Sequence, residues 1–381
     1  MIRKSKLTLI FQKWIKNMEH LKLSEHIVYA NPIPQLRSRQ GKFPGAVKLP
    51  SGEILVLLEI GEAFESADSR TYVVRSSDNG YTWSFQGEMY RYPDNCKYSE
   101  AVKPTLLNDG NLIAVGYRFD RSDPDLPIGN PKTGGLLPGK DVVSFSNDQG
   151  RTWSVPTVIE TQCPEVLEVS GPCIQLTSGE LLAIGSPFKM WDGSNPSGQC
   201  GIVLRSKDLG KTWDCKTNFF DLNGITPWES RICQMHDGRL ITISWCYDLK
   251  QDKSLNNHVV FSHNQGKTWS KPLDTKIMAQ ASNILPLKDS KLLSIHAHRA
   301  GEIGLALRLV DVANDEWNVL EEKFIWGNSK AASSSGNIIQ QFANLKFGQP
   351  SFLKLSDNEF LVFFWCIEDC IGKIKAIRIH F

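Results

Sequence analysis

Polar residues recur at one end of six apolar segments in this chain, each of which runs into a tight turn. Counting back nine residues from the third residue of each four-residue turn gives equivalent positions, held by Phe43, Ala101, Ser170, Glu229, Ala281 and Gln349. Their neighbours include Lys42, Glu100, Lys103, Glu168, Gln280 and Asn283. Charged side chains are seldom buried without partners, so such a ring predicts a polar pocket suited to a sugar. The alternative is a solvated end of a central channel.

Three loops that follow apolar segments carry further reactive groups. The first spans Glu62–Arg70 and contains Glu65 and Asp68. The second begins with Tyr117–Asp120 and continues in a Pro/Gly-rich insertion to about Gly139. The third brings together the neighbouring residues His296, His298 and Arg299. Long loops on a rigid scaffold often carry function, so these groups are candidates to face the same pocket.

The segments that must position these residues are joined by a repeated hairpin turn. Clear copies lie at Leu49–Ile54, Leu107–Leu112, Leu176–Leu181 and Met235–Leu240, and weaker copies at 287–292 and 355–360. An Asp-Gly pair between apolar segments is a strong hairpin signal, because glycine adopts positive φ without steric cost. Six hairpins at similar spacing predict six sequential β-modules.

A second repeat follows each of the first four hairpins. It reads S-x-D-x-G-x-T-W at Ser76–Trp83, Ser146–Trp153 and Ser206–Trp213, and Ser262–Trp269 has Asn264 in the Asp position. A worn fifth copy lies at 311–317. The carboxylate can accept N–H groups of its own turn while the tryptophan covers it. Each module is therefore expected to contain four strands.

These repeats predict an all-β fold, a six-bladed β-propeller with four-stranded antiparallel blades. The last module has three obvious strands, at 351–355, 360–366 and 373–380. We expect an N-terminal strand over Glu25–Asn31 to complete that blade and close the ring, which removes exposed sheet edges. The propeller then covers residues 25–381, and residues 1–24 form a basic amphipathic segment, either packed on the body or a weak membrane-surface anchor.

Composition limits the possible partners. The formal net charge of +2 argues against nucleic acid or a membrane surface as a partner. The nine cysteines sit singly, without C-x-x-C pairs, so neither a metal site, a cofactor nor a disulfide scaffold is expected. The N-terminal apolar stretch is too short for a signal peptide or a membrane span, so a cytoplasmic protein is expected. The oligomeric state stays open.

The S-x-D-x-G-x-T-W spacing resembles the Asp-box (BNR) repeat of the sialidase superfamily, and the resemblance runs from about Arg39 to Phe381. Gly41–Pro44 is similar to the first-blade motif of that family, and Ser170–Leu176 to its third-blade Gly-Pro strand. Glu229 falls where sialidases place the glutamate that serves a tyrosine nucleophile. The resemblance implies an enzyme that cleaves a glycosidic bond.

The same resemblance marks departures from the family. Sialidases bind the sialic carboxylate with three arginines, and the first of these positions is Lys42 here, while the second aligns with Trp245. Arg299 lies near the third position. The tyrosine position aligns with Gln349, which cannot act as a covalent nucleophile.

We therefore expect a sialidase-like glycoside hydrolase, exo-acting on a sialic-acid-like or other acidic glycan. Two carboxylates are enough for glycoside hydrolysis, and the resemblance points to Asp68, with Glu65 as its rival, opposite Glu229. Lys42 and Arg299 would hold an acidic group, Trp245 would stack on the sugar, and Gln349 would hydrogen-bond to it. The complete set of expected substrate-binding residues is Arg39, Lys42, Glu65, Glu100, Trp245, His298, Arg299 and Gln349.

Two alternatives stay open. A non-catalytic propeller that binds a glycan or a protein would have no carboxylate pair within about 10 Å across the pocket. A polysaccharide lyase would act on a uronic acid, with Lys42 or Arg299 neutralising the carboxylate and His296 or His298 as the base.

Overall fold

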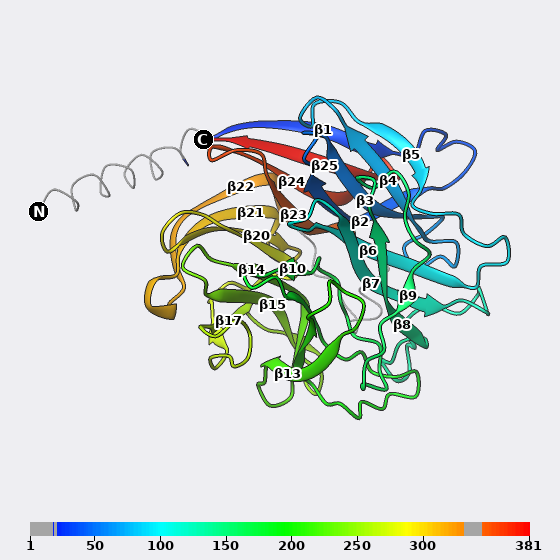
Figure 1. Ribbon diagram of the computed structural model, residues 1–381. Helices are drawn as coiled ribbons and strands as arrows, with labels where there is room; N and C mark the ends of the chain where they lie inside the picture. The colour runs from blue at the N-terminus through cyan, green and yellow to red at the C-terminus, as the bar shows by residue number, and fades with distance from the viewer. Residues whose placement is uncertain (1–17, 19–20, 331–344) are drawn as a thin grey trace, which may run out of the picture.

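The computed structural model describes residue 18 and residues 21–330 and 345–381, which form six antiparallel sheets arranged as the blades of a propeller (Figure 1). The predicted all-β, six-bladed fold is confirmed. Most of the predicted amphipathic segment, residues 1–24, lies outside the described residues. Of that segment, Met18 and Leu21 are buried in a hydrophobic cluster with side chains of blades five and six.

Each blade runs from an inner to an outer strand. Blade one contains β2 (Gln40–Lys48), β3 (Ile54–Gly61), β4 (Arg70–Ser76) and β5 (Ser84–Glu88). Blade two contains β6 (Tyr98–Leu106), β7 (Leu112–Asp120), β8 (Gly139–Ser146) and β9 (Thr157–Val158). Blade three contains β10 (Ile174–Gln175), β11 (Leu181–Gly185), β12 (Gly201–Ser206) and β13 (Asp214–Phe220).

The remaining blades follow the same order. Blade four contains β14 (Ile225–Gln234), β15 (Leu240–Asp248), β17 (His258–Ser262) and β18 (Leu273–Asp274), and a short extra strand, β16 (Lys253–Ser254), pairs with β15. Blade five contains β19 (Ser282–Pro286), β20 (Lys291–His298), β21 (Glu302–Asp311) and β22 (Asn318–Lys330), with a 3₁₀ turn at Ala313–Asp315. Blade six contains β23 (Phe347–Lys354), β24 (Glu359–Glu368), β25 (Ile371–His380) and β1 (Lys22–Ala30).

The predicted ring closure is confirmed by the pairing of the two ends of the described chain. The N-terminal strand β1 pairs antiparallel with β25, with Lys22 opposite His380, and forms the outer strand of blade six. It begins earlier than the predicted residue 25. Figure 1 shows β1 and β25 side by side.

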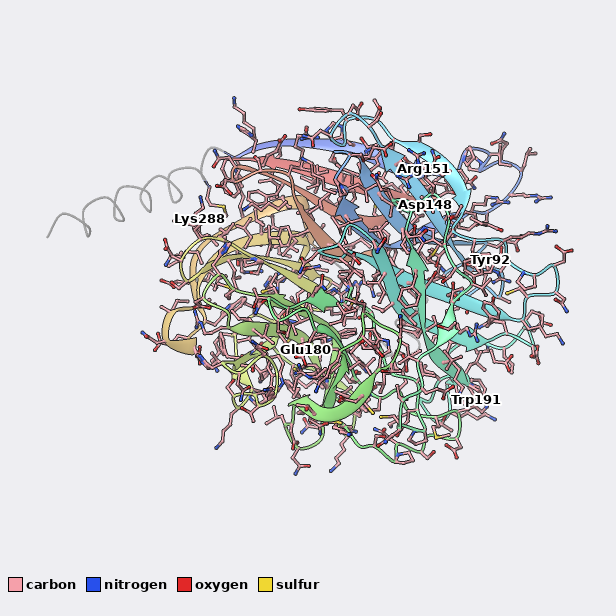
Figure 2. All side chains as sticks on the ribbon, in the orientation of Figure 1. Tyr92, Asp148, Arg151, Glu180, Trp191 and Lys288 are labelled. Carbon is pink, nitrogen blue, oxygen red and sulfur yellow. The ribbon has the colours of Figure 1, made fainter. Side chains whose placement is uncertain are left out.

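The Asp-box turns are hydrogen-bonded as their sequence predicts. In the second box, Asp148 Oδ1 accepts the backbone N–H groups of Arg151 and Thr152, both at 3.0 Å, and Oδ2 accepts the Thr152 hydroxyl at 2.6 Å. The hydroxyl of Ser146 donates to Oδ1 at 2.8 Å. Figure 2 shows Asp148 and Arg151 together on this turn. The box carboxylates therefore hold turns before outer strands.

A repeated arginine ties neighbouring blades together at these turns. Arg378 donates to the carbonyl of Asn79 in the first box, Arg75 to that of Gln149 in the second, and Arg205 to that of Gln265 in the fourth, each at 2.6 Å. Each arginine also pairs with a glutamate of its own blade.

In the described residues no helix is long and apolar enough to cross a membrane.

Candidate active site

Three inner strands carry the same irregularity at the positions that the turn count made equivalent. Phe43, Glu229 and Gln349 have φ values of 51°, 47° and 43°, in the left-handed region that non-glycine residues rarely adopt. The register of β2, β14 and β23 shifts around each of them, which marks a bulge. Bulges re-aim side chains, and backbone strain of this kind clusters at functional sites. All three side chains face one cavity.

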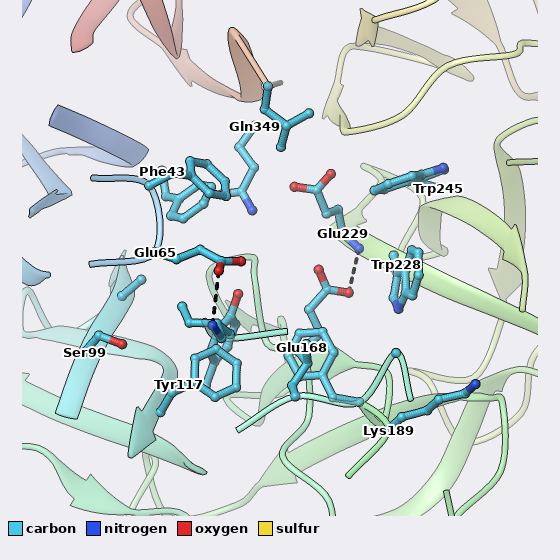
Figure 3. Close-up of a pocket in the computed structure, with 18 of the residues that line it drawn as sticks. Phe43, Glu65, Ser99, Tyr117, Glu168, Lys189, Trp228, Glu229, Trp245 and Gln349 are labelled. Atoms are coloured by element: carbon cyan, nitrogen blue, oxygen red, sulfur yellow. Dashed lines mark hydrogen bonds between the residues drawn. The ribbon is translucent and has the colours of Figure 1, made fainter. Parts of the chain in front are cut away.

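That cavity has a volume of about 370 Å³ and is walled by inner strands and loops of all six blades. Six of the ten predicted site residues line it: Glu65, Glu100, Glu229, Trp245, Arg299 and Gln349. Figure 3 shows Glu65, Glu229 and Gln349 around its centre, with Phe43, Trp228 and Trp245 beside them. A wall that combines aromatic rings with convergent polar groups is typical of a small-molecule site.

Two glutamates from neighbouring blades meet in this wall. The backbone N–H of Glu229 donates to Glu168 Oε2 at 3.0 Å (Figure 3). Burial and then the negative charge of Glu229 raise the pKa of Glu168 to about 8. Glu168 is therefore protonated at neutral pH. On Glu229, which is 8% exposed, Oε2 has no hydrogen-bond partner among the described residues. The carboxyl group of Glu168 therefore carries a proton, and the neighbouring carboxyl group of Glu229 has an oxygen atom without a hydrogen-bond donor.

The two predicted carboxylates of the first loop are separated by the structure. Glu65 lines the cavity, accepts the Ile128 N–H at 3.1 Å, and has its pKa raised chiefly by burial. This bond ties the loop to the insertion of blade two. Asp68 is exposed, does not line the cavity, and accepts the N–H of Glu62 at 3.0 Å. Of this pair, Glu65 is the one placed to reach a ligand.

Glu100 lines the cavity in contact with tyrosines. Its carboxyl group accepts hydrogen bonds from Tyr92 at 3.0 Å and from Tyr90 at 3.2 Å. Burial raises the pKa of Glu100 to about 7, against the lowering effect of these two hydroxyls.

Two of the predicted cations lie outside the cavity wall. Lys42 is 1% exposed and pairs with Glu59 at 3.0 Å, and its ammonium group also donates to the carbonyls of Ala63 and Phe64. Through these contacts Lys42 anchors the loop that contains Ala63 and Phe64 to β3. Arg39 is half-buried and interacts with Tyr72 of β4. Neither group is placed to receive the acidic group of a ligand at this cavity.

The third predicted cation, Arg299, does line the cavity, and its guanidinium group already has protein partners. Its Nε and Nη2 donate to the carbonyl of Phe347 at 2.9 and 2.7 Å, and Nη1 donates to Gln280. Trp245 packs edge-to-face on Trp228, with ring centroids 5.3 Å apart. The indole N–H of Trp245 donates to Ser254 at 3.2 Å, so its ring is fixed in the wall.

The two histidines proposed as lyase bases point elsewhere. His296 is fully buried between Asn257 and Ser294, with both ring nitrogens in contact with these side chains. His298 contacts Arg308 at 3.0 Å, and burial followed by that arginine lowers the pKa of His298 to about 4. Neither side chain lines the cavity.

Some wall residues had no predicted role. Glu168 was recognised only as a neighbour of the polar ring, and Trp228 was not singled out. Tyr117 lines the cavity, and burial raises its pKa well above 10.0, so it stays a hydrogen-bond donor. Tyr117 was predicted only as the first residue of a loop facing the pocket, and Trp228 precedes Glu229 in the chain and lies opposite Trp245 in the pairing of β14 with β15. Among the residues with described positions, no three His, Cys, Asp or Glu side chains are arranged to hold a metal ion.

Comparison with known proteins defines the class of protein. A BNR/Asp-box repeat is recognised at residues 260–271, and the chain matches no curated protein. A protein of unknown function from Dyadobacter fermentans matches with a TM-score of 0.72 and 17% identity, over 94% of this chain and 99% of that one. The chain is therefore a six-bladed β-propeller with BNR/Asp-box repeats.

Solved sialidases share this architecture. The Hadza microbial sialidase Hz136 has a TM-score of 0.61 and 16% identity over 88% of this chain, which spans 65% of that protein. The NanB sialidase of Streptococcus pneumoniae has a TM-score of 0.62 and 13% identity over 93% of this chain, which spans 70% of that protein. At such identities the similarity establishes the fold alone.

Proposed function

We propose that this propeller is a glycoside hydrolase whose reaction takes place in the cavity between Glu168 and Glu229. The observation that carries the proposal is the unequal pair. Glu168 holds its proton at neutral pH, whereas Glu229 presents a buried oxygen without a partner. Glycosidases need one carboxylic acid that protonates the leaving oxygen and one carboxylate that attacks the sugar or activates water.

In this proposal Glu168 is the general acid and Glu229 is the nucleophile or base. The strained backbone of Glu229 aims its carboxylate into the cavity, and the N–H of the same residue holds Glu168 in place. Glu65 is a second candidate for the acid, because it lines the opposite part of the wall and burial raises its pKa. Trp228 and Trp245 offer flat apolar surfaces to sugar rings.

A non-catalytic glycan-binding propeller is the second candidate. The wall position aligned with the catalytic tyrosine of sialidases is Gln349, and the guanidinium group of Arg299 is held by protein acceptors. Such a protein would bind a sugar in the same cavity and leave its linkage intact.

A screen of aryl glycosides, including sialosides, distinguishes the two. We expect the wild-type protein to hydrolyse at least one class of glycoside, Glu229→Gln to lose that activity, and Glu62→Gln to keep it. Glu62 is a suitable control, because it is an exposed glutamate in the same loop as Glu65. Full turnover by a folded Glu229→Gln protein would refute the assignment, and sugar binding without turnover would favour the second candidate.

A further inference from the structure

Two buried hydrogen-bond acceptors of the cavity have no donor among the described residues. Glu229 Oε2 and Gln349 Oε1 are shielded from water and have no partner within the described residues, and the two side chains are 8% and 5% exposed. A buried acceptor without a donor destabilises the protein, because it has lost its hydrogen bonds to water and gained none in return. A ligand group that supplies N–H or O–H removes this cost, whereas a carboxylate group has no donor to offer. The indole N–H of Trp365, also unpartnered, packs next to Gly348.

Carboxyl groups dominate the charged part of the wall. Blades one to four contribute Glu65, Glu100, Glu168 and Glu229, and Asp252 lines the same cavity, while Glu59 is paired with Lys42. The cations of the wall are placed differently. Lys132 is exposed on the insertion of blade two, and the ammonium end of Lys189 lies away from Glu168 and Glu229 in Figure 3.

Arg299 is the remaining cation of the wall, and its charge acts on Glu229. Its guanidinium group donates to the Phe347 carbonyl and to Gln280, so it is anchored in the scaffold. The wall also contains the aromatic rings of Phe43, Tyr117 and Trp228, and aromatic rings attract cations: the ammonium groups of Lys42 and Lys103 lie 6.0 and 5.5 Å from the Phe43 ring. Carboxylates and aromatic rings suit a protonated amine, and among the carboxyl groups of the wall Glu168 contributes no negative charge at neutral pH because it holds a proton.

From these contacts we propose that the cavity binds the protonated amine of an amino sugar, with the ammonium group donating to Glu229 and Gln349. The proposal rests on the proposed function only for the premise that the ligand is a sugar. It differs from the acidic glycan expected from the sequence, because Lys42 does not line the cavity and the guanidinium group of Arg299 is already bonded to Phe347 and Gln280. The ligand class is thus a glycan with a free amino group.

Matched free monosaccharides test the charge of the ligand without any bond to hydrolyse. Binding to the full chain is measured by calorimetry at a slightly acidic pH, where the amine is protonated. The probes are glucosamine, N-acetylglucosamine, glucose and glucuronate, the same four forms of galactose, and N-acetylneuraminate. Benzylamine, benzyl alcohol and benzoate form a second set that contains no sugar.

We expect the amine to bind about tenfold more tightly than the matching hydroxyl compound, and the acids to bind least. N-acetylglucosamine keeps the N–H donor but lacks the charge, so it should fall between amine and acid. Glu229→Gln should abolish the advantage of the amine, and Glu62→Gln should preserve it. Circular dichroism and a melting curve establish that both variants are folded.

The outcomes separate this inference from the proposed function. If glucuronate or N-acetylneuraminate binds best, or if no amine binds better than its hydroxyl counterpart, the inference is overturned and hydrolysis can still occur. If benzylamine binds but no sugar does, the amino-sugar inference is overturned even though the cavity accepts a cation, and the glycoside screen still decides the proposed function separately. If neither probe set binds, the inference is wrong.

Discussion

The carboxyl groups of the Asp-box turns and those of the cavity have pKa values shifted in opposite directions, although both belong to the same propeller. In the third Asp box, hydrogen bonds from the hydroxyl and then the N–H of Thr212 lower the pKa of Asp208 to about 2. In the cavity, burial and a neighbouring negative charge raise the pKa of Glu168 to about 8. The first group is held by its own turn, and the second is buried beside another carboxyl group. The repeated carboxylates therefore stabilise the fold, and the unrepeated ones are available for chemistry.

The largest expected effect comes from removing the proton donor. Glu168→Gln should lower kcat by about 10²–10⁴ on substrates with poor leaving groups, because nothing then protonates the departing oxygen. Substrates with good leaving groups should be affected much less, since they leave without protonation. Steady-state kinetics on a series of aryl glycosides measures this difference. An equal loss across the series would show that Glu168 is not the acid.

A second expected effect is a pH dependence of stability with opposite signs in the two regions. Between pH 4.5, the ordinary value for glutamate, and about 8, folded Glu168 keeps a proton that the unfolded chain has released. The free energy of unfolding therefore falls as pH rises through this window. Denaturant unfolding of Glu168→Gln should show a smaller fall than the wild type, because the raised pKa values of Glu100 and Asp141 still contribute to it.

Asp208 should act in the reverse direction. Its pKa is lowered from 3.8 to about 2, so its contribution is complete above pH 3.8 and is lost as pH falls through about 2. The Asp208→Asn variant should therefore be less stable than the wild type at neutral pH and nearly equal to it in strong acid. A constant difference between the two proteins at all pH values would contradict this account.

Much of this contrast could be predicted from the sequence, because turns and hairpins are local. The Asp boxes and glycine turns fixed the register, and the register identified Phe43, Glu229 and Gln349 as equivalent positions. The register of the β2–β3 hairpin also places Lys42 opposite Glu59, and so it predicts the pairing of these two side chains. Loops that contact other blades lie beyond such reasoning.

The choice between Glu65 and Asp68 is such a case. It depends on the bond from Ile128, which lies 63 residues further along the chain. Glu168 was undervalued for a similar reason. The inner strand of its blade is only Ile174–Gln175, so no regular alternation pointed to it. Burial of a carboxyl group is a property of the assembled ring, and a single segment does not reveal it.

A moderate loss of stability is expected when a box carboxylate is removed. Asp208→Ala deletes the acceptor of the Ser206 hydroxyl and of the N–H and hydroxyl of Thr212. The free energy of unfolding should fall by about 1–2 kcal/mol, as for loss of a capping side chain. Activity per folded molecule should be unchanged. A selective loss of activity at full stability would give this box a role beyond its turn.

The smallest expected effect comes from the natural exception. In the fourth box, Asn264 Oδ1 accepts the Thr268 N–H at 2.9 Å, and Nδ2 donates to the hydroxyl of Thr268 at 2.8 Å. Asn264→Asp lets that hydroxyl donate instead, as in the other boxes, and adds charge-assisted bonds. We expect a stabilisation of about 0.5 kcal/mol at neutral pH, measured by denaturant unfolding. A destabilised variant would show that this turn has adapted to the amide.

Infrared titration of the carboxyl groups tests the central contrast most directly. Glu100 and the buried Asp141 also have raised pKa values, so the wild-type spectrum is compared with that of Glu168→Gln. The account predicts that the protonated carboxyl band at neutral pH is weaker in Glu168→Gln than in the wild type, that the lost component titrates around pH 8, and that Asp208→Asn and Glu62→Gln keep the full band. Identical neutral-pH spectra for wild type and Glu168→Gln would contradict it, because Glu168 would then be ionised like an ordinary glutamate.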